Sequence, residues 1–171
     1  MIPADRPSAG DQAAPIRPAA VLDASVALKL VLAETHSDRA EALVTAALRA
    51  RQALYGPPSL PLEVLSALYQ RARRRDPTTA ITFEQAEQCL ADFLAIPIDI
   101  ESPSDLYPRT FAFARAHGLA RTYDAVYVVL AQSLGVDLWT DDQSLLNALG
   151  SAAPWVRWIG DYPLPEDEAT S

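Results

Sequence analysis

Short apolar runs alternate along this chain with longer segments of helical spacing. Runs at 19–22, 96–100, 136–139 and 156–159 are too short for helices and are typical of buried strands, with a weaker fifth candidate at 54–55. In the longer segments between them, apolar residues recur every three or four positions, as on one face of a helix. This alternation predicts a parallel sheet with helices on both faces. We expect an α/β fold: a single three-layer α/β/α domain around a central, mostly parallel sheet.

The helical segments carry start and stop signals. They lie at 25–33, 36–52, 60–75, 83–94, 105–117, 122–134 and 143–149. Ser37, Thr82 and Ser104 are candidate N-caps, and Gly118 is a candidate C-terminal stop. The segment 122–134 is apolar on nearly every side, which predicts a buried helix.

One domain, residues 19–162, is expected to account for most of the 171-residue chain. Residues 1–18 contain four prolines and no periodic pattern, so we expect either a disordered extension or a start codon assigned too early. Residues 163–171 are expected to form a loose acidic tail. Cys89 is the only cysteine, which excludes an intrachain disulfide and is typical of a cytoplasmic protein. No run approaches the ~20 apolar residues that a membrane span needs.

Four carboxylates stand where this architecture would bring side chains together. Asp23 follows the first strand, Asp142 follows the strand at 136–139, Asp124 opens the apolar helix, and Glu63 lies in the first turn of its helix. In open α/β sheets the chemistry lies beyond the carboxyl ends of the strands. Taken singly, Asp23 or Asp124 could instead be a helix cap. Taken together, four acids would repel one another unless cations held them, and oxygen ligands in this number suit Mg²⁺ or Mn²⁺.

Four stretches resemble, in order, the motifs of PIN-domain ribonucleases, and most closely those of VapC-type toxins. They read VLDAS at 21–25, LEVLSAL at 62–68, YDAVYVVLA at 123–131 and LWTDDQSL at 138–145. The resemblance covers roughly residues 20–160. It implies a PIN-like fold and Mg²⁺- or Mn²⁺-dependent cleavage of RNA, often a structured RNA such as tRNA. It also implies inhibition by a cognate antitoxin, as in type II toxin–antitoxin systems, and a tendency to form homodimers.

The same resemblance assigns roles to individual residues. It gives metal binding and catalysis to four acids, Asp23, Glu63, Asp124 and Asp142. Thr140 matches a hydroxyl residue two positions before the last acid, and Ser25 a small polar residue two positions after the first. We expect both hydroxyls to donate hydrogen bonds to carboxylates and fix their orientation. Asp141 and Asp142 are adjacent, and the spacing to Thr140 favours Asp142, with Asp141 as a supporting acid behind the ligands.

The net charge of −8 does not favour a nucleic-acid partner at first sight. However, three acids lie in the tail after Pro163, and bound cations would offset the four site carboxylates, so the rest of the chain is nearly neutral. Five arginines are candidates for RNA contact: Arg71, Arg73, Arg74, Arg75 and Arg121. For the arginines at 71–75, a solvated helix end that complements the helix dipole is favoured slightly over contact with RNA phosphates. Arg121 could pair with an acid or touch substrate.

Other residues have two interpretations each. Lys29, the only lysine, could be a surface residue or a phosphate contact. Tyr123 and Tyr127 could stack on bases, although tyrosines in so apolar a helix are more often core. His36 and His117, the only histidines, do not favour a histidine-rich metal site or a two-histidine nuclease.

Competing functions lack their key residues. A response-regulator receiver needs a late lysine, and a haloacid-dehalogenase-like phosphatase needs an aspartate where Ser25 stands. The remaining alternative is a PIN-like protein that binds a partner peptide or RNA without cutting it.

Overall fold

The sheet is parallel throughout. The computed structural model of the protein describes residues 19–76 and 78–165, so the expected extension at 1–18 and the tail beyond Pro165 lie outside the described residues. Its strands are β1 (Ala20–Leu22), β2 (Leu54–Gly56), β3 (Ile98–Ile100), β4 (Asp137–Thr140) and β5 (Val156–Trp158). All four neighbouring pairs are parallel, which confirms the expected α/β class.

The strand order β3-β2-β1-β4-β5 reverses direction at the centre of the sheet. From β1 the chain builds outward through β2 and β3, then returns to the other side of β1 to add β4 and β5. Val21 of β1 therefore pairs with Tyr55 on one side and with Leu138 on the other. Where such an order reverses, the loops leaving β1 and β4 diverge and open a crevice at the carboxyl edge.

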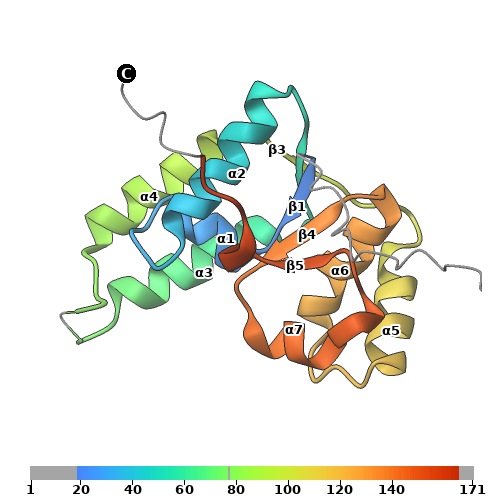
Figure 1. Cartoon of the computed structure of the whole chain (residues 1–171). Coiled ribbons are helices and arrows are strands. Elements are labelled where there is room, and N and C mark those ends of the chain that lie inside the picture. The colour runs from blue at the N-terminus through green and yellow to red at the C-terminus, as the bar shows by residue number, and fades with distance from the viewer. Residues whose placement is uncertain (1–18, 77, 166–171) are drawn as a thin grey trace, which may run out of the picture.

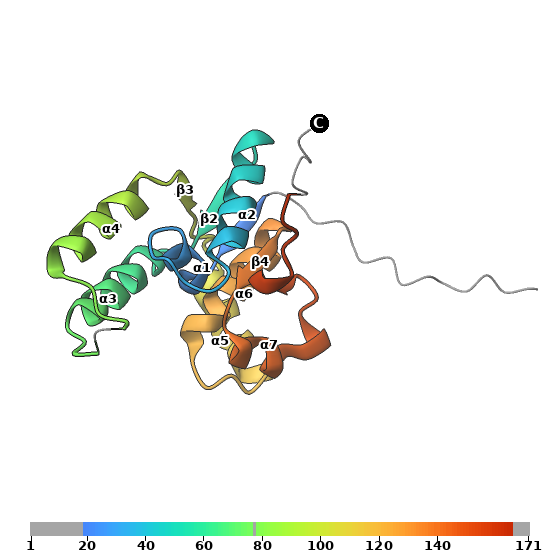
Figure 2. The same cartoon turned by 60° about the vertical axis from the view of Figure 1, so that its left-hand side comes forward.

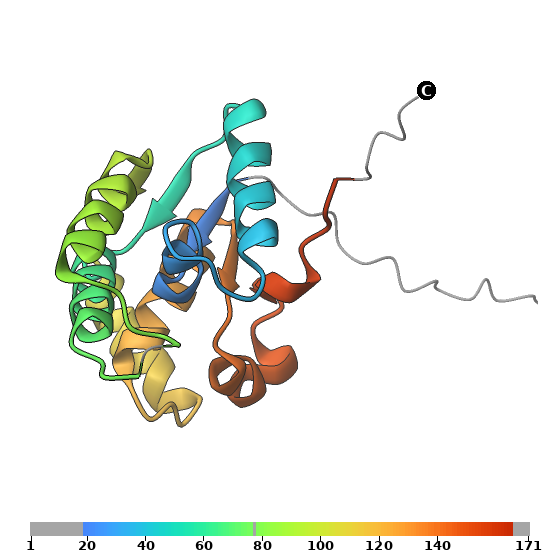
Figure 3. The same cartoon turned by 90° about the vertical axis from the view of Figure 1, so that its left-hand side faces the viewer.

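Helices cover both faces of the sheet. They are α1 (Ala24–Lys29), α2 (Ser37–Arg49), α3 (Leu60–Ala72), α4 (Phe83–Ala95), α5 (Leu106–Ala116), α6 (Thr122–Leu134) and α7 (Gln143–Leu149). Figure 3 shows the layers, with α3 and α4 on one side of the strands and α2 on the other. In Figures 1 and 2, α3 and α4 lie side by side and project from the body of the domain.

Alternate residues of the central strands feed two separate cores. Val21 and Leu138 point to the face that packs against α6, whereas Leu22 and Trp139 point to the face covered by α2. This is the two-residue period of a strand buried on both sides. The buried helix predicted at 122–134 is confirmed as α6, with every residue from Ala125 to Ala131 buried. Its packing fixes the first turn of α6 at the carboxyl edge of β1 and β4.

Some expected helix ends are confirmed and others are wrong. Thr82 caps α4 through a reciprocal capping box with Gln85, and Gly118, with φ +62°, follows the end of α5. Ser104 is not a cap, because α5 begins one residue later than expected, after Asp105. Ser37 is the first residue of α2 and not its cap: its hydroxyl accepts from the N–H of Glu34 and closes the preceding loop.

Helix α3 ends at Ala72, three residues earlier than the sequence predicted. The backbone N–H groups of Arg73 and Arg74 bond three residues back, to Gln70 and Arg71, and the helix unwinds in this tighter turn ahead of Pro77. Within residues 19–76 and 78–165, no helix is long and apolar enough to cross a membrane.

Candidate active site

Asp23 stands at the point where the strand order reverses. It follows β1 directly, and its backbone N–H donates to the carbonyl of Trp139 in β4 at 3.1 Å. Although Asp23 occupies the N-cap position of α1, its side chain makes no capping hydrogen bond. The interpretation of Asp23 as a mere helix cap is therefore wrong, and its carboxylate is available for other contacts.

Two hydroxyls hold the Asp23 carboxylate. Its Oδ2 accepts from Thr140 Oγ1 at 2.6 Å and from Ser25 Oγ at 2.7 Å. Each hydroxyl oxygen in turn accepts a backbone N–H of the turn after β4: Thr140 from Asp142 at 3.0 Å, and Ser25 from Asp141 at 2.9 Å. This relay fixes the carboxylate of one strand end against the backbone of the other.

The acids act on one another electrostatically. Burial raises the pKa of Asp23 and the negative charge of Asp142 raises it further, against the hydrogen bonds from Thr140 and Ser25. Burial also raises the pKa of Asp124, and Asp142 and Asp23 add to that effect while Arg121 opposes it. The four acids thus share one field although they come from four separate segments. Gathering them costs free energy, which a bound cation would offset.

Glu63 supplies an unpaired oxygen to this group. Burial raises the pKa of Glu63, and the charges of Asp23 and Asp124 raise it further, while the nearby hydroxyls of Ser59 and Tyr127 lower it. Nevertheless, Glu63 Oε1 is buried without a hydrogen-bond partner among the described residues. An unpaired buried carboxylate oxygen is costly and calls for a ligand, either a cation or a water.

The adjacent Asp141 and Asp142 face different surroundings. Asp142 caps α7 by accepting the backbone N–H of Ser144 at 2.8 Å, and it is the one whose charge reaches Asp23 and Asp124. Asp141 points away and forms an ion pair with Lys29 Nζ at 2.8 Å. Burial alone would raise the pKa of Asp141, but the ammonium of Lys29 and the other donors around it hold the pKa below its usual range. Asp141 supports the site through its backbone N–H and not through its carboxylate.

Sequence reasoning missed the ionic network behind the site. Lys29, expected as a surface residue or a phosphate contact, is buried and pairs with Asp141 and with Glu34. Glu34 pairs in turn with Arg71, and His36 Nδ1 lies 3.4 Å from Asp141 Oδ1. The signal was available in part: the only lysine of the sequence lies six residues after Asp23, in the last turn of the short helix α1 that begins directly after that strand end.

The donor atoms of the four acids are of the type that binds a divalent cation. They are carboxylate oxygens, the donors that Mg²⁺ and Mn²⁺ prefer, and Glu63 Oε1 lacks any other partner within the described part of the chain. In residues 19–76 and 78–165, no group of three or more His, Cys, Asp or Glu side chains already has the close arrangement of a metal site. Binding of one cation by several of these acids would therefore require their side chains to move closer together than they lie in the structure.

Comparison with known proteins decides the family. The model of the PIN domain matches residues 20–149, which include all four acids. This chain belongs to the PIN-domain family. Ribonuclease VapC3 of Mycobacterium tuberculosis is 36% identical to it over 132 residues, or 77% of this chain and 88% of that protein. Ribonuclease VapC3 of Pyrobaculum aerophilum is 32% identical over 125 residues, or 73% of this chain and 90% of that protein. The resemblance to VapC-type ribonucleases is confirmed.

A solved structure supports the fold of this PIN domain. The crystal structure of PAE2754 from Pyrobaculum aerophilum superposes with a TM-score of 0.60 over 83% of this chain and 92% of that chain, at 24% identity. The three-layer PIN-like architecture is therefore shown by both sequence and structure.

The arginines of this PIN domain differ in their surroundings. Arg71 pairs with Glu34, whereas Arg73, Arg74 and Arg75 are exposed beyond the end of α3. Arg121 is exposed at the start of α6, where its charge lowers the pKa of Asp124. The structure thus separates Arg71, which is engaged in the fold, from four arginines that remain accessible.

The two tyrosines of α6 also differ in how deeply they are buried. Tyr127 is buried, as favoured from the sequence, but the expectation that Tyr123 is core is wrong, since 66% of Tyr123 is exposed. The reason is its position in the first turn of the helix, before the chain passes beneath α5.

Proposed function

We propose that this PIN domain is a Mg²⁺- or Mn²⁺-dependent endoribonuclease and the toxin of a type II toxin–antitoxin system. One observation carries the proposal: four acids from separate segments share one electrostatic field at the reversal point of the sheet. The relatives named ribonuclease VapC3, which cover most of the chain, support RNA as the substrate. From the same relatives we infer a cognate antitoxin. We further propose action in the cytoplasm, a homodimer, and a structured RNA such as tRNA as the target.

The residues divide the chemical work. Asp23, Asp124 and Asp142 would hold the cation, and Glu63 would complete the set or orient a water. When bound, the divalent cation would lower the pKa of a water and stabilise the leaving oxygen of a phosphodiester. Thr140 and Ser25 keep the Asp23 carboxylate in a fixed orientation, so that substrate binding need not organise it.

The decisive test compares Asp23→Asn with Asp99→Asn. Asp99 is an exposed aspartate of β3, away from the acids, and serves as the matched control. RNA ends are sequenced after induced expression, and purified proteins are assayed on the cleaved RNA with Mg²⁺. We expect defined cleavage by the wild type and by Asp99→Asn, and none by Asp23→Asn with an unchanged circular dichroism spectrum. Equal cleavage by Asp23→Asn would overturn the assignment.

A second measurement separates cutting from mere binding. Mn²⁺ should raise the melting temperature of the wild type and raise it far less in Asp23→Asn. A wild type that binds RNA but neither cleaves it nor responds to Mn²⁺ would be a PIN-like binding protein, which contradicts the proposed activity.

A further inference from the structure

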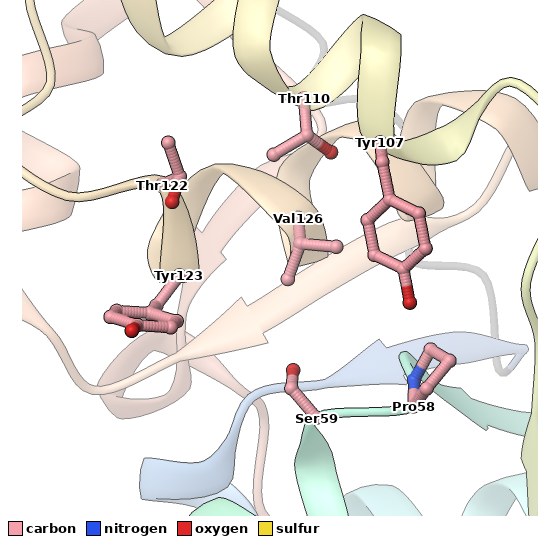
Figure 4. Close-up of a pocket in the computed structure, with 7 residues that line it drawn as sticks. All are labelled: Pro58, Ser59, Tyr107, Thr110, Thr122, Tyr123 and Val126. Atoms are coloured by element: carbon pink, nitrogen blue, oxygen red, sulfur yellow. The ribbon is translucent and has the colours of Figure 1, made fainter.

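A cavity of about 250 Å³ opens between the start of α3 and the helices α5 and α6. Figure 4 shows its lining residues: Pro58, Ser59, Tyr107, Thr110, Thr122, Tyr123 and Val126. The rings of Tyr107 and Tyr123 lie on opposite sides of Val126, and Pro58 and Ser59 lie across from it. None of the four acids lines this cavity, so it is distinct from the candidate metal site.

The cavity nevertheless adjoins the acids through two of its residues. Tyr123 precedes Asp124 in the first turn of α6, and it also lines the open hollow that contains Glu63. Ser59 lies close enough to Glu63 to lower the pKa of that carboxyl. The Ser59 hydroxyl is buried without a hydrogen-bond partner in the described ranges. A ligand held at the acids could therefore extend directly into the cavity.

The lining suits a flat aromatic ring with a polar edge. Tyr107 and Tyr123 are 61% and 66% exposed, so most of each side chain is accessible to a ligand. Val126 gives an apolar contact between them. Thr110 donates its hydroxyl to the carbonyl of Leu106, whereas the buried hydroxyl of Ser59, beside Glu63, forms no hydrogen bond within the described ranges. Exposed tyrosine faces beside a nuclease site are typical platforms for unstacked bases.

We propose that this cavity binds one nucleobase of the RNA, from a nucleotide next to the phosphodiester that is hydrolysed at the acids. The assignment rests on the proposed ribonuclease function and adds a specificity subsite to it. Stacking on Tyr107 and Tyr123 would supply affinity, and the Ser59 hydroxyl would bond the edge of the base. Because the cavity takes a base only when it is splayed out, it selects single-stranded or looped RNA over a continuous helix.

The test uses binding, so that it does not depend on cleavage. A single-stranded RNA selected for binding to the full-length Asp23→Asn protein is made with 2-aminopurine at one position at a time. The fluorescence of this base falls when it stacks on an aromatic ring. We expect one position to be quenched on binding, and Tyr107→Ala to remove that quenching and weaken binding roughly five- to a hundredfold. Tyr107→Phe keeps the ring and should keep both signals.

Phe111→Ala is the matched control. Phe111 is an exposed aromatic residue of α5, one turn after Tyr107, and does not line the cavity. It should leave quenching and affinity unchanged. Unaltered quenching in Tyr107→Ala would overturn the proposal. The proposal is also overturned if Tyr107→Ala sediments as a monomer where the wild type is a dimer and still binds RNA as tightly, because the cavity would then be an interface between two copies of the chain. Failure of the wild type to cleave any RNA refutes the nuclease proposal but does not alter this binding result.

Discussion

The ammonium of Lys29 is the structural centre of the network behind the acids. Lys29 is 5% exposed, and its Nζ lies 2.8 Å from Asp141 Oδ2 and 3.5 Å from Glu34 Oε2. Glu34 extends the network to Arg71 in α3. Since the Asp141 backbone N–H donates to Ser25, Lys29 stabilises the turn on which the orientation of the site depends.

Replacing Lys29 with methionine removes the charge and keeps most of the apolar stem. Breaking a buried ion pair on one side costs about 3–5 kcal/mol, because the remaining charge stays buried and unpaired. The Asp141 side chain is 25% exposed, so water screens part of its charge and the lower end of that range applies. We therefore expect a loss of about 3 kcal/mol in the free energy of unfolding. For a chain of this size, that corresponds to roughly 6–12 °C in melting temperature.

Urea unfolding at constant pH measures the loss. Asp105→Asn is the control, because the Arg109–Asp105 pair is 3.8 Å apart with side chains 38% and 60% exposed, and such surface pairs are worth at most about 1 kcal/mol. Adding Asp141→Asn to Lys29→Met should restore part of the stability, since no unpaired carboxylate then remains. The reasoning is refuted if Lys29→Met stays within about 1 kcal/mol of the wild type, or if the double variant is less stable than the single one.

Three further predictions address the site. In EDTA, the three acids with raised pKa values bind protons more tightly in the folded state, so the free energy of unfolding should fall as pH rises above about 4, the ordinary pKa of a carboxyl group. Urea titrations should show a shallower fall in Asp23→Asn, and a rise with pH would contradict the sign. Thr140→Val removes the donor to Asp23 and the acceptor of a backbone N–H, so it should cost about 1–3 kcal/mol and slow cleavage, whereas Thr140→Ser should restore both. If Arg73 and Arg74 contact phosphates, their replacement by alanine should lower the salt dependence of RNA binding. Arg49 is the control: it is exposed at the opposite end of the domain from the acids, and its replacement by alanine should leave the salt dependence unchanged. If the wild type and all of these variants show the same salt dependence, Arg73 and Arg74 do not contact RNA phosphates and only complement the dipole at the end of α3.

The elements themselves were largely predictable from local pattern. The bounds of α6 and α7 agree with the sequence to the residue, because a wholly apolar segment and a helix directly after an aspartate leave few alternatives. Ser37 failed as a predicted cap because its hydroxyl serves the loop before it, through Glu34 and Leu32. A serine that can cap a helix can equally close a turn, and only the path of the chain decides which bond it makes.

For the candidate site, the sequence predicted which strand ends come together but not how the side chains there are oriented. Reversal of the strand order at β1 and β4 brings together residues that follow those strands, so Asp23 and the 141–142 pair had to lie close. Which of the two adjacent acids joins Asp23 depends on the direction in which each side chain leaves the turn after β4. That direction is set by tertiary contacts that the sequence does not display.

The two adjacent aspartates show how a parallel sheet can hold opposed charge environments one residue apart. Asp141 faces Lys29, His36 and Trp158, and its pKa is lowered. Asp142 faces the crevice, where its charge helps to raise the pKa of Asp23 and Asp124. Successive side chains at a strand end leave toward opposite sides, so one acid can be neutralised by the fold while its neighbour stays available to a cation. The ion pair of Lys29 thereby removes the competing carboxylate from the crevice, and its loss should perturb cation binding as well as stability.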